Sequence, residues 1–371
     1  MKSGLKIALV HDQLNQAGGA ERVLFALTKL FPKAPIYTLL YDKKRLKGFE
    51  NSKIKTSFIQ SLPFSTTLFK WYLPFMPAAV ENLNLKGFDI VISSSSALIK
   101  GIITDPQTLH ICYCHTPTRY LWSDTNDYTE KLNQPGLIKK ILPLYLSKLR
   151  TWDQLAAQRV DAYIANSNFV KDRIRNYYRR ESLVVNPPVD TSEYKTSSEV
   201  GDYFVMVGRL RPYKKFDLAI KAFNKLKIPL KIIGIGEQEE ELRKMSRSNI
   251  EFLGHLSEEE KRTILSKAKA LISPQIEDFG INMIESMAAG RPVISYADGG
   301  ALEIIKPGIT GEFMENQTWE SLVNVVLNFD ANKYDSKVIS EEALKYSTEN
   351  FLNNFENSIE EILKSQAPHL L

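Results

Sequence analysis

The chain has 371 residues, of which 43% are hydrophobic and 25% are charged, and its formal net charge at pH 7 is +5. This length exceeds one ordinary hydrophobic core and predicts two domains of about 150–200 residues each. The composition is that of a soluble globular protein without low-complexity tracts, and no apolar run reaches the ~18–20 residues that a transmembrane span requires.

Charge is divided unevenly along the chain. Residues 1–188 carry a formal charge of +12, whereas residues 189–371 carry −7. A basic first half predicts a face that meets an anionic surface or an anionic acceptor. Ordinary solvated lysines on helices would explain the same excess, and the count alone leaves both interpretations open.

Cysteine usage and the chain start predict a cytoplasmic protein. Cys112 and Cys114 lie two residues apart on one face of a predicted strand, which suits neither a disulfide nor, without further ligands, a zinc site. The start, MKSGLKIALVHD, reads as a strand rather than as a signal peptide. Both observations fit a reducing compartment.

The first predicted elements are a strand at Lys6–Val10, a loop that contains Gly18 and Gly19, and a helix. This order is the beginning of a βαβ unit. Glycines before a helix let backbone N–H groups approach an anion at the helix N-terminus. Turns also need glycine, so the pair by itself is weak evidence for an anion site.

Further short apolar runs predict a parallel sheet in the first half, because helical segments separate several of them. The predicted strands are Ile36–Leu40, Asp89–Ser93, Thr108–Cys114, Ala162–Asn166 and Leu183–Val185. A segment rich in Phe, Trp and Pro, Phe58–Val80, lies between them. The later segment Gly136–Arg159 is a basic amphipathic helix, which either lies on an anionic membrane or packs on the domain core.

The sequence NPPVD at 186–190, followed by a polar stretch, predicts the domain boundary at residue 188. The second domain is then 189–346, and a C-terminal helix within 347–371 follows, which a resemblance to a known family implies is part of the first domain. A second series of strands and helices follows the boundary. Its predicted strands are Tyr203–Val207, Leu230–Ile233, Ile250–Leu253, Ala270–Ile272 and Pro292–Tyr296. The periodicity thus predicts an α/β protein with two Rossmann-like domains facing across a cleft.

A basic loop follows the first strand of the second domain. In GRLRPYKK, Arg209 can fork onto phosphate oxygens and Lys214 can add a point charge. A solvated basic turn would look the same when read alone. An acidic loop three strands later favours a ligand, because carboxylates opposite cations suit a nucleoside diphosphate sugar.

The acidic loop belongs to Ser273–Gly300, which reads as a strand end, a loop and a short helix stopped by Gly290. Glu285 is predicted to reach the ribose, with helix capping or a surface salt bridge as the alternative. Glu277 is predicted to meet the transferred sugar. The backbone N–H groups of Phe279, Gly280 and Ile281 would meet the adjoining phosphate at the helix start.

The stretch from Glu277 to Gly300 resembles the E-x7-E signature of glycosyltransferase family 4, whose members are retaining enzymes of the GT-B fold. Other segments fall in the order of that family: GGAERVL, CHTPTRYLW, ANSNFVKDRIRNYY, VVNPPVD, VGRLRPYKKFDLAI and FLGHLSEEE. The resemblance therefore extends over nearly the whole chain. CHTPTRYLW together with PPVD is similar to the mannosyltransferase-like subgroup that builds bacterial O-antigen and other surface polysaccharides.

The resemblance implies roles for individual residues. Arg209 and Lys214 would bind the donor diphosphate, Glu285 the ribose, and Glu277 the donor sugar. The loop at Gly18 and Gly19 would lie near the phosphates from the other domain. His115 matches the family histidine that faces the donor sugar near the reacting carbon, although a histidine in such a strand-end HTP sequence is more often structural. Lys215 departs from the pattern, since many relatives have Gly or Arg there.

The expected chemistry is a metal-independent front-face displacement. No carboxylate presents itself as the nucleophile that a double displacement needs, and no Asp-x-Asp motif is present to hold a metal ion on phosphates. The resemblance implies that the departing diphosphate helps to deprotonate the acceptor, while Arg209 and Lys214 stabilise the charge that grows on it. No cofactor is expected, and GDP-mannose is the favoured donor.

Other functions fit the sequence less well. A sugar-nucleotide 2-epimerase would need further acid/base carboxylates, and a phosphorylase would be far longer. An inactive nucleotide-sugar binding protein could lose His115 and Glu277, and both are present. An NAD-dependent oxidoreductase would need a G-x-G-x-x-G fingerprint, and the sequence Gly234-Ile235-Gly236 continues without the third glycine.

The expected acceptor is a glycan or a polyprenyl-diphosphate-linked glycan. A basic first domain with aromatic, amphipathic segments fits such an acceptor at the inner membrane face, with peripheral binding to an anionic membrane surface. No nucleic-acid partner is expected.

Overall fold

A computed structural model describes residues 4–125 and 136–371. The predicted basic amphipathic segment starts inside α4 (Gly136–Ala157), but the side chains of its first turn, Lys139 and Lys140 included, lie outside the described residues. The chain divides into two units, which are taken separately here. Unit 1 comprises Met1–Pro187 and Phe351–Leu371, and unit 2 comprises Pro188–Asn350.

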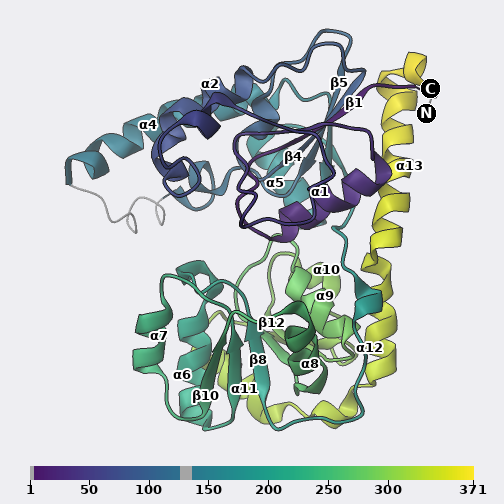
Figure 1. The fold of residues 1–371 in the computed structure, drawn as a ribbon. Coiled ribbons are helices and arrows are strands. Elements are labelled where there is room, and N and C mark those ends of the chain that lie inside the picture. Colours follow the sequence, from purple (N-terminus) through teal and green to yellow (C-terminus); the bar gives the residue numbers. More distant parts are fainter. Residues whose placement is uncertain (1–3, 126–135) are drawn as a thin grey trace. The chain divides into compact units, whose positions relative to one another are not determined.

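Unit 1 is built on a fully parallel sheet of seven strands in the order β3-β2-β1-β4-β5-β6-β7 (Figure 1). The strands are β1 (Ile7–His11), β2 (Ile36–Thr38), β3 (Ile54–Thr56), β4 (Ile90–Ser95), β5 (Leu109–Cys114), β6 (Ala162–Ala165) and β7 (Ser182–Val184). Six of them fall where the sequence predicted strands. The edge strand β3 was not predicted, because its sequence IKT has a single apolar residue and no apolar run.

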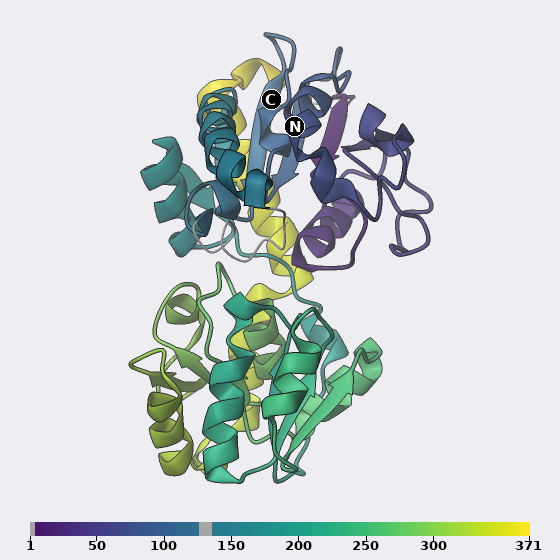
Figure 2. The same cartoon turned by 90° about the vertical axis from the view of Figure 1, so that its left-hand side faces the viewer.

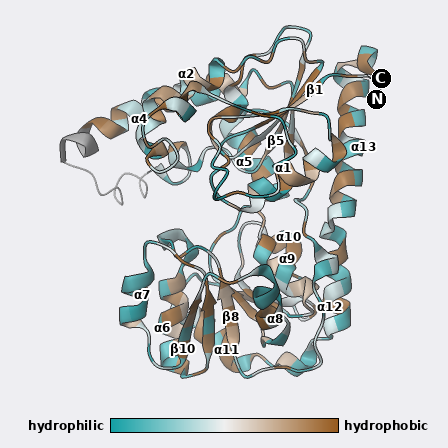
Figure 3. Ribbon diagram, viewed as in Figure 1, coloured by the Kyte–Doolittle hydropathy of each residue, from teal (hydrophilic) through white to brown (hydrophobic). Residues whose placement is uncertain are grey.

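Side-chain alternation along these strands produces a hydrophobic core on each face of the sheet. In β1, Leu9 packs into one core, whereas Ala8 and Val10 pack into the other. The helices that cover the faces are α1 (Gly19–Leu30), α2 (Met76–Glu81), α4 and α5 (Asn168–Tyr178). The C-terminal helix α13 (Thr348–Gln366) adds Phe351 and Phe355 to the core that contains Leu9. Its hydrophobic and hydrophilic residues interleave along the helix, as expected for a helix with one buried face (Figure 3).

Unit 2 is built on a parallel sheet of six strands in the order β10-β9-β8-β11-β12-β13. Most of its strands and helices are drawn in teal and green (Figure 2). The strands are β8 (Phe204–Val207), β9 (Leu230–Ile233), β10 (Ile250–Gly254), β11 (Leu271–Ser273), β12 (Val293–Tyr296) and β13 (Gly311–Met314). The helices are α6 (Phe216–Leu226), α7 (Glu239–Met245), α8 (Glu258–Lys267), α9 (Ile281–Ala288), α10 (Ala301–Ile304), α11 (Trp319–Asn328) and α12 (Ser336–Ala343). Strand β13 was not predicted, since its GEFM sequence lacks a run of β-branched residues.

Each sheet has one topological switch point, where connections leave a pair of neighbouring strands in opposite directions. In unit 1 the switch point lies between β1 and β4, and in unit 2 it lies between β8 and β11. Open α/β sheets bind ligands outside the carboxyl ends of the strands at such points. The residues that follow β1 and β4, and those that follow β8 and β11, are therefore the first places to look for a site.

Among the helices of residues 4–125 and 136–371, none is long and apolar enough to cross a membrane.

Candidate functional site

The switch point of unit 2 carries an ion pair. Lys214 ends the short 3-10 helix Pro212–Lys214 after β8, and its Nζ donates to Oε1 of Glu277 in the loop after β11. The two side chains are 14% and 16% exposed. The structure thus joins the basic loop and the acidic loop that the sequence analysis paired, and it leaves both charges reachable from solvent. Arg209 is exposed on the same basic loop.

The position of Glu277 is fixed by its neighbours. Its Oε1 also accepts a 2.8 Å hydrogen bond from Nε2 of the buried Gln275. The backbone carbonyl of Glu277 accepts from the N–H of Gly300 at 2.8 Å. A Cβ atom at Gly300 would stand 2.1 Å from the carbonyl oxygen of Phe279, and Gly299 has a φ of +64°. Gly299 and Gly300, at the end of the motif, therefore allow the loop after β12 to pack against the acidic loop. The sequence alone did not reveal this role.

Gly280 separates the acidic loop from α9. Its φ of +116° is accessible to glycine and costly for other residues. It is the N-cap of α9, and no side chain caps the helix there. Phe279 is buried in the core, and Ile281 begins the helix. The first N–H groups of α9 have no acceptor within the helix, which leaves them suited to an anion.

Glu285 lies within α9 and is fully buried. Its Oε1 pairs with Nζ of Lys261 on α8 at 3.1 Å, and Lys261 also contacts Oε2 of Glu258 at 2.8 Å. The salt bridge that the sequence left as the alternative for Glu285 is thus present, but it is a buried one. Lys261 was not singled out, because an i, i+3 pair with Glu258 on a surface helix already explains a lysine there.

The switch point of unit 1 carries a different set of groups. Ser94 at the end of β4 hydrogen bonds to two histidines: its Oγ lies 2.8 Å from Nε2 of His115 and 3.1 Å from Nδ1 of His11. Nε2 of His11 lies 3.7 Å from Oε1 of Glu21 in the first turn of α1. Burial, together with the nearby His11, lowers the pKa of His115 to about 3, so this imidazole is neutral at physiological pH.

Gly18 and Gly19 stand at the start of α1. Gly18 is the N-cap with extended backbone angles (φ −148°, ψ −172°), so neither turn geometry nor positive φ requires glycine there. A Cβ atom on Gly18 would approach Oε2 of Glu21 to 2.9 Å. The helix N-terminus already has the Glu21 carboxylate beside it, which weakens the case for a phosphate at this loop.

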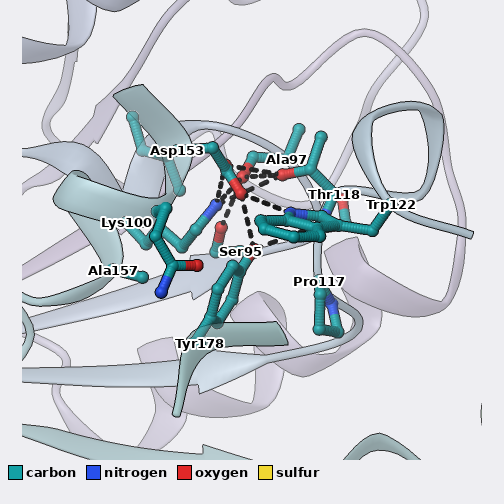
Figure 4. A network of polar contacts seen from close by, with 12 residues as sticks. Ser95, Ala97, Lys100, Pro117, Thr118, Trp122, Asp153, Ala157 and Tyr178 are labelled. Carbon is teal, nitrogen blue, oxygen red and sulfur yellow. Dashed lines mark hydrogen bonds and ion pairs between the residues drawn. The ribbon is translucent and has the colours of Figure 1, made fainter. Parts of the chain in front are cut away.

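The segment CHTPTRYLW contributes mainly to a buried network around Asp153 of α4 (Figure 4). The Asp153 carboxylate accepts from Nζ of Lys100 at 2.5 Å, from Oγ1 of Thr118 at 3.0 Å, from Nε1 of Trp122 at 2.8 Å and from the hydroxyl of Tyr178 at 3.0 Å. Asp153 is fully buried and Lys100 is 1% exposed. A buried carboxylate with four donors is satisfied, so this network holds α4 and α5 to the sheet edge rather than awaiting a ligand.

Metal ligands were not expected from the sequence. Within residues 4–125 and 136–371, no group of three or more His, Cys, Asp or Glu side chains is arranged to hold a metal ion. Cys112 and Cys114 are buried, and neither forms a disulfide.

Two parallel α/β units with this strand order form the GT-B fold. Two family models match the chain: Glycosyltransferase Family 4 over residues 17–193, and Glycosyl transferases group 1 over residues 192–346. The chain belongs to glycosyltransferase family 4, as its motifs had indicated, and it is a glycosyltransferase rather than an epimerase.

Several curated relatives are mannosyltransferases. The Alpha-1,3/1,6-mannosyltransferase ALG2 of Saccharomyces cerevisiae is 25% identical over 379 residues, which cover 82% of this chain and 72% of that protein. The O-antigen chain mannosyltransferase C of Escherichia coli is 26% identical over 194 residues, which cover 48% of this chain and 51% of that protein. Among solved structures, the Anabaena protein HepE in complex with UDP and glucose aligns with a TM-score of 0.72 over 96% of this chain and 99% of that one. At 18% identity this last likeness concerns the fold alone.

Proposed function

We propose that the protein transfers mannose from GDP-mannose, with retention, to a glycan or a polyprenyl-diphosphate-linked glycan in cell-surface polysaccharide synthesis. The observation that carries the donor site is the solvent-reachable Lys214–Glu277 pair at the switch point of unit 2. The choice of mannose is supported by the names of the relatives, a yeast and a bacterial mannosyltransferase.

The reaction needs no cofactor beyond the donor. The bond from the anomeric carbon to the β-phosphate oxygen breaks, and a bond from that carbon to the acceptor oxygen forms on the same face. The acceptor proton passes to the departing diphosphate. Arg209 and Lys214 stabilise the negative charge that grows on the diphosphate, and this charge stabilisation replaces that of a metal ion.

Glu277 orients the transferred sugar. When a diphosphate binds Lys214, the Glu277 carboxylate is free to accept hydrogen bonds from sugar hydroxyls, while Gln275 continues to hold it. The N–H groups at Phe279, Gly280 and Ile281 meet the adjoining phosphate. Glu285 reaches the ribose after rearranging its contact with Lys261, and His115 serves the sugar from unit 1.

A panel of nucleoside diphosphate hexoses, each offered with lipid-linked glycan acceptors, tests this assignment. The expected result is transfer from GDP-mannose and an α-linked product from the α-linked donor. A product of inverted configuration, or turnover with none of the donors, would exclude the proposed reaction. Thermal-shift measurements with GDP, UDP and NAD provide the control, and only the nucleoside diphosphates should stabilise unit 2.

We also propose that the protein is cytoplasmic and binds the inner membrane face through unit 1. Residues 58–75 expose five large apolar side chains: Phe58, Phe64, Leu68, Trp71 and Phe75. Residues 51–80 contain three lysines and neither Asp nor Glu. Residues 136–152 of α4 likewise contain three lysines and neither Asp nor Glu. Ile141, Leu144 and Lys148 are exposed there. The hydroxyl of Tyr145 on α4 donates to the carbonyl of Leu73 at 3.1 Å, which joins the two segments.

An apolar surface rimmed by cations and without carboxylates is complementary to anionic lipid. Co-sedimentation with vesicles of phosphatidylcholine and of phosphatidylcholine with an anionic lipid tests this surface. W71A/F75A should lose most binding to the anionic vesicles, and binding should weaken as salt is raised. L302A/L327A, which removes two exposed leucines of unit 2, is the matched control and should bind as the native protein does. Equal binding by both double variants would refute the proposed surface.

A further inference from the structure

Three segments that the sequence analysis treated separately converge at the switch point of unit 1. They are the strand end at His11, the first turn of α1 at Glu21, and His115 after β5. Ser94 at the end of β4 joins the two histidines. Exposed fractions are 2% for His11, 5% for Glu21 and below 1% for Ser94, whereas His115 is partly exposed. The group at the end of this series is thus the one that a ligand can reach.

The chemistry of each member fixes the direction of the hydrogen bonds. A carboxylate only accepts, so Glu21 favours a proton on Nε2 of His11, 3.7 Å away. A neutral His11 then has an unprotonated Nδ1, which accepts from the Ser94 hydroxyl at 3.1 Å. Having donated its only proton, Ser94 must accept from Nε2 of His115 at 2.8 Å. A neutral His115 with a proton on Nε2 has a lone pair on Nδ1.

We propose that Glu21, His11 and Ser94 are positioning residues that hold His115 as the Nε2–H tautomer, with Nδ1 as an acceptor for a hydroxyl group of the transferred sugar. This inference rests on the proposed function for the identity of the hydroxyl, but the tautomer is a property of the protein alone. It also assigns a role to the GGAE sequence that differs from phosphate binding: Gly18 gives the Glu21 carboxylate room at the helix start.

The surroundings of His115 support a fixed orientation. Its backbone N–H donates to the carbonyl of Ser95 at 2.8 Å, and its carbonyl accepts from Nδ2 of Asn166 at 2.9 Å. The edge of the Tyr113 ring packs against the imidazole with centroids 5.1 Å apart. Asp12, the carboxylate next to His11, already accepts from the N–H groups of Ser96, Ala97 and Ile99 at 2.6–2.9 Å. Glu21 is therefore the carboxylate that orients His11.

Strand β4 offers a matched control. Ser93 points to the opposite face of the sheet and hydrogen bonds to Nε2 of His110 at 2.8 Å, and both residues are fully buried. This pair repeats the Ser94–His115 contact in a place that no ligand reaches. Ser93→Ala therefore reproduces the loss of a buried serine–histidine bond in the same strand without touching the series from Glu21 to His115.

The first test is the tautomer of His115 in the full chain labelled with ¹⁵N-histidine. The sequence holds five histidines, and His115→Gln identifies the signals of interest. We expect Nε2 protonated and Nδ1 unprotonated at pH 7.5, and a mixture of both tautomers in Ser94→Ala. A native His115 protonated on Nδ1, or a Ser94→Ala spectrum unchanged at His115, would overturn the proposal.

The second test is a double-mutant cycle on transfer from GDP-mannose. Ser94→Ala should lower kcat about tenfold, the size of effect seen when the partner that orients a histidine is removed, with little change in the KM of the donor. Glu21→Gln should lower kcat by less, and adding it to Ser94→Ala should lower kcat no further, because the connection is already broken. Independent, multiplicative effects would overturn the series. Ser93→Ala should keep native kcat.

The two tests separate this inference from the proposed function. If no nucleoside diphosphate sugar is turned over, the proposed function fails while the spectra still decide the tautomer. If His115→Gln abolishes transfer but Ser94→Ala and Glu21→Gln match the native enzyme, the proposed function stands and the positioning role is rejected.

Discussion

The two sheets share one strand order around their switch points but place opposite kinds of chemistry there. In unit 2 the strand ends meet as a Lys214–Glu277 ion pair with about one seventh of each side chain exposed. In unit 1 they meet as a serine–histidine series whose inner members are buried. The common topology places both sets of residues at the carboxyl ends of the strands. The two sets differ in how far their side chains are buried.

The difference shows which charged pairs serve stability and which serve a ligand. Unit 1 also contains an ion pair, Lys100–Asp153, but it is sealed and its carboxylate is saturated with donors. The Lys214–Glu277 pair is only partly buried, so solvent screens it more than it screens the sealed Lys100–Asp153 pair. In the proposed function, Lys214 binds the diphosphate and Glu277 binds sugar hydroxyls once the two side chains separate.

The largest effect is expected for Asp153→Ala, which tests whether the buried ion pair stabilises unit 1. Removing the carboxylate leaves the Lys100 ammonium buried without a counter-charge, which should cost about 3–5 kcal/mol of unfolding free energy. Urea denaturation measures it. The double variant K100M/D153L should recover most of the loss, because a hydrophobic pair replaces the ionic one. A single variant as stable as the native protein would show that the network does not hold unit 1 together.

In unit 2 the corresponding change, Glu277→Ala, should affect activity and spare the fold. We expect kcat to fall about 10²–10³-fold, since the carboxylate orients the transferred sugar. The unfolding free energy should change by less than it does in Asp153→Ala, because solvent can reach the Lys214 ammonium that remains. Steady-state kinetics and denaturation of the same sample measure the two quantities. An inactive variant that is also unfolded would remove the contrast with Asp153.

The buried histidines predict a pH effect on stability. Burial lowers the pKa of His110 to about 3, as it does for His115, against 6.5 for an unperturbed histidine. The unfolded chain therefore binds protons first as the pH falls, so stability is full above pH 6.5 and is lost between pH 6.5 and 3. Each histidine contributes a slope of at most about 1.4 kcal/mol per pH unit.

The paired variant S93A/H110L removes one of these titrating groups. Its unfolding free energy, measured by urea denaturation from pH 7.5 to 4, should fall less steeply than that of the native protein by about one proton's contribution. Parallel curves would show that His110 is not a buried neutral imidazole.

The smallest expected effect concerns the membrane surface. Lys148→Ala on the exposed face of α4 should weaken binding to anionic vesicles about fivefold, which corresponds to about 1 kcal/mol for one cation near the surface. Lys221→Ala on α6 of unit 2 is the control and should bind as the native protein does. If both lysines had the same effect, only the overall charge of the chain would matter.

Much of the fold could be predicted because each unit repeats one pattern. Buried parallel strands read as short apolar runs, and Gly290 marked the end of α9 as expected, with a φ of +75°. Strands β3 and β13 escaped prediction, since IKT and GEFM contain no run of β-branched or apolar residues and their pairing depends on neighbours distant in sequence.

The candidate site could be predicted only in part. The Lys214–Glu277 pair followed from placing a basic and an acidic loop at the same edge of a parallel sheet. The partner of Glu285 did not, because Lys261 lies on another helix and nothing local marks it. In the series from Glu21 to His115, Ser94 lies 83 positions from His11 and 21 positions from His115. Only the register of β1, β4 and β5 brings these residues together.

The most direct measurement is the rate of GDP-mannose-dependent transfer by Lys214→Ala relative to the native enzyme, with Lys221→Ala as the surface-lysine control. Charge stabilisation of the leaving diphosphate by Lys214 predicts a loss of at least about 10²-fold in kcat with unchanged thermal stability. A Lys214→Ala enzyme with native turnover would contradict the placement of the donor diphosphate at the switch point of unit 2.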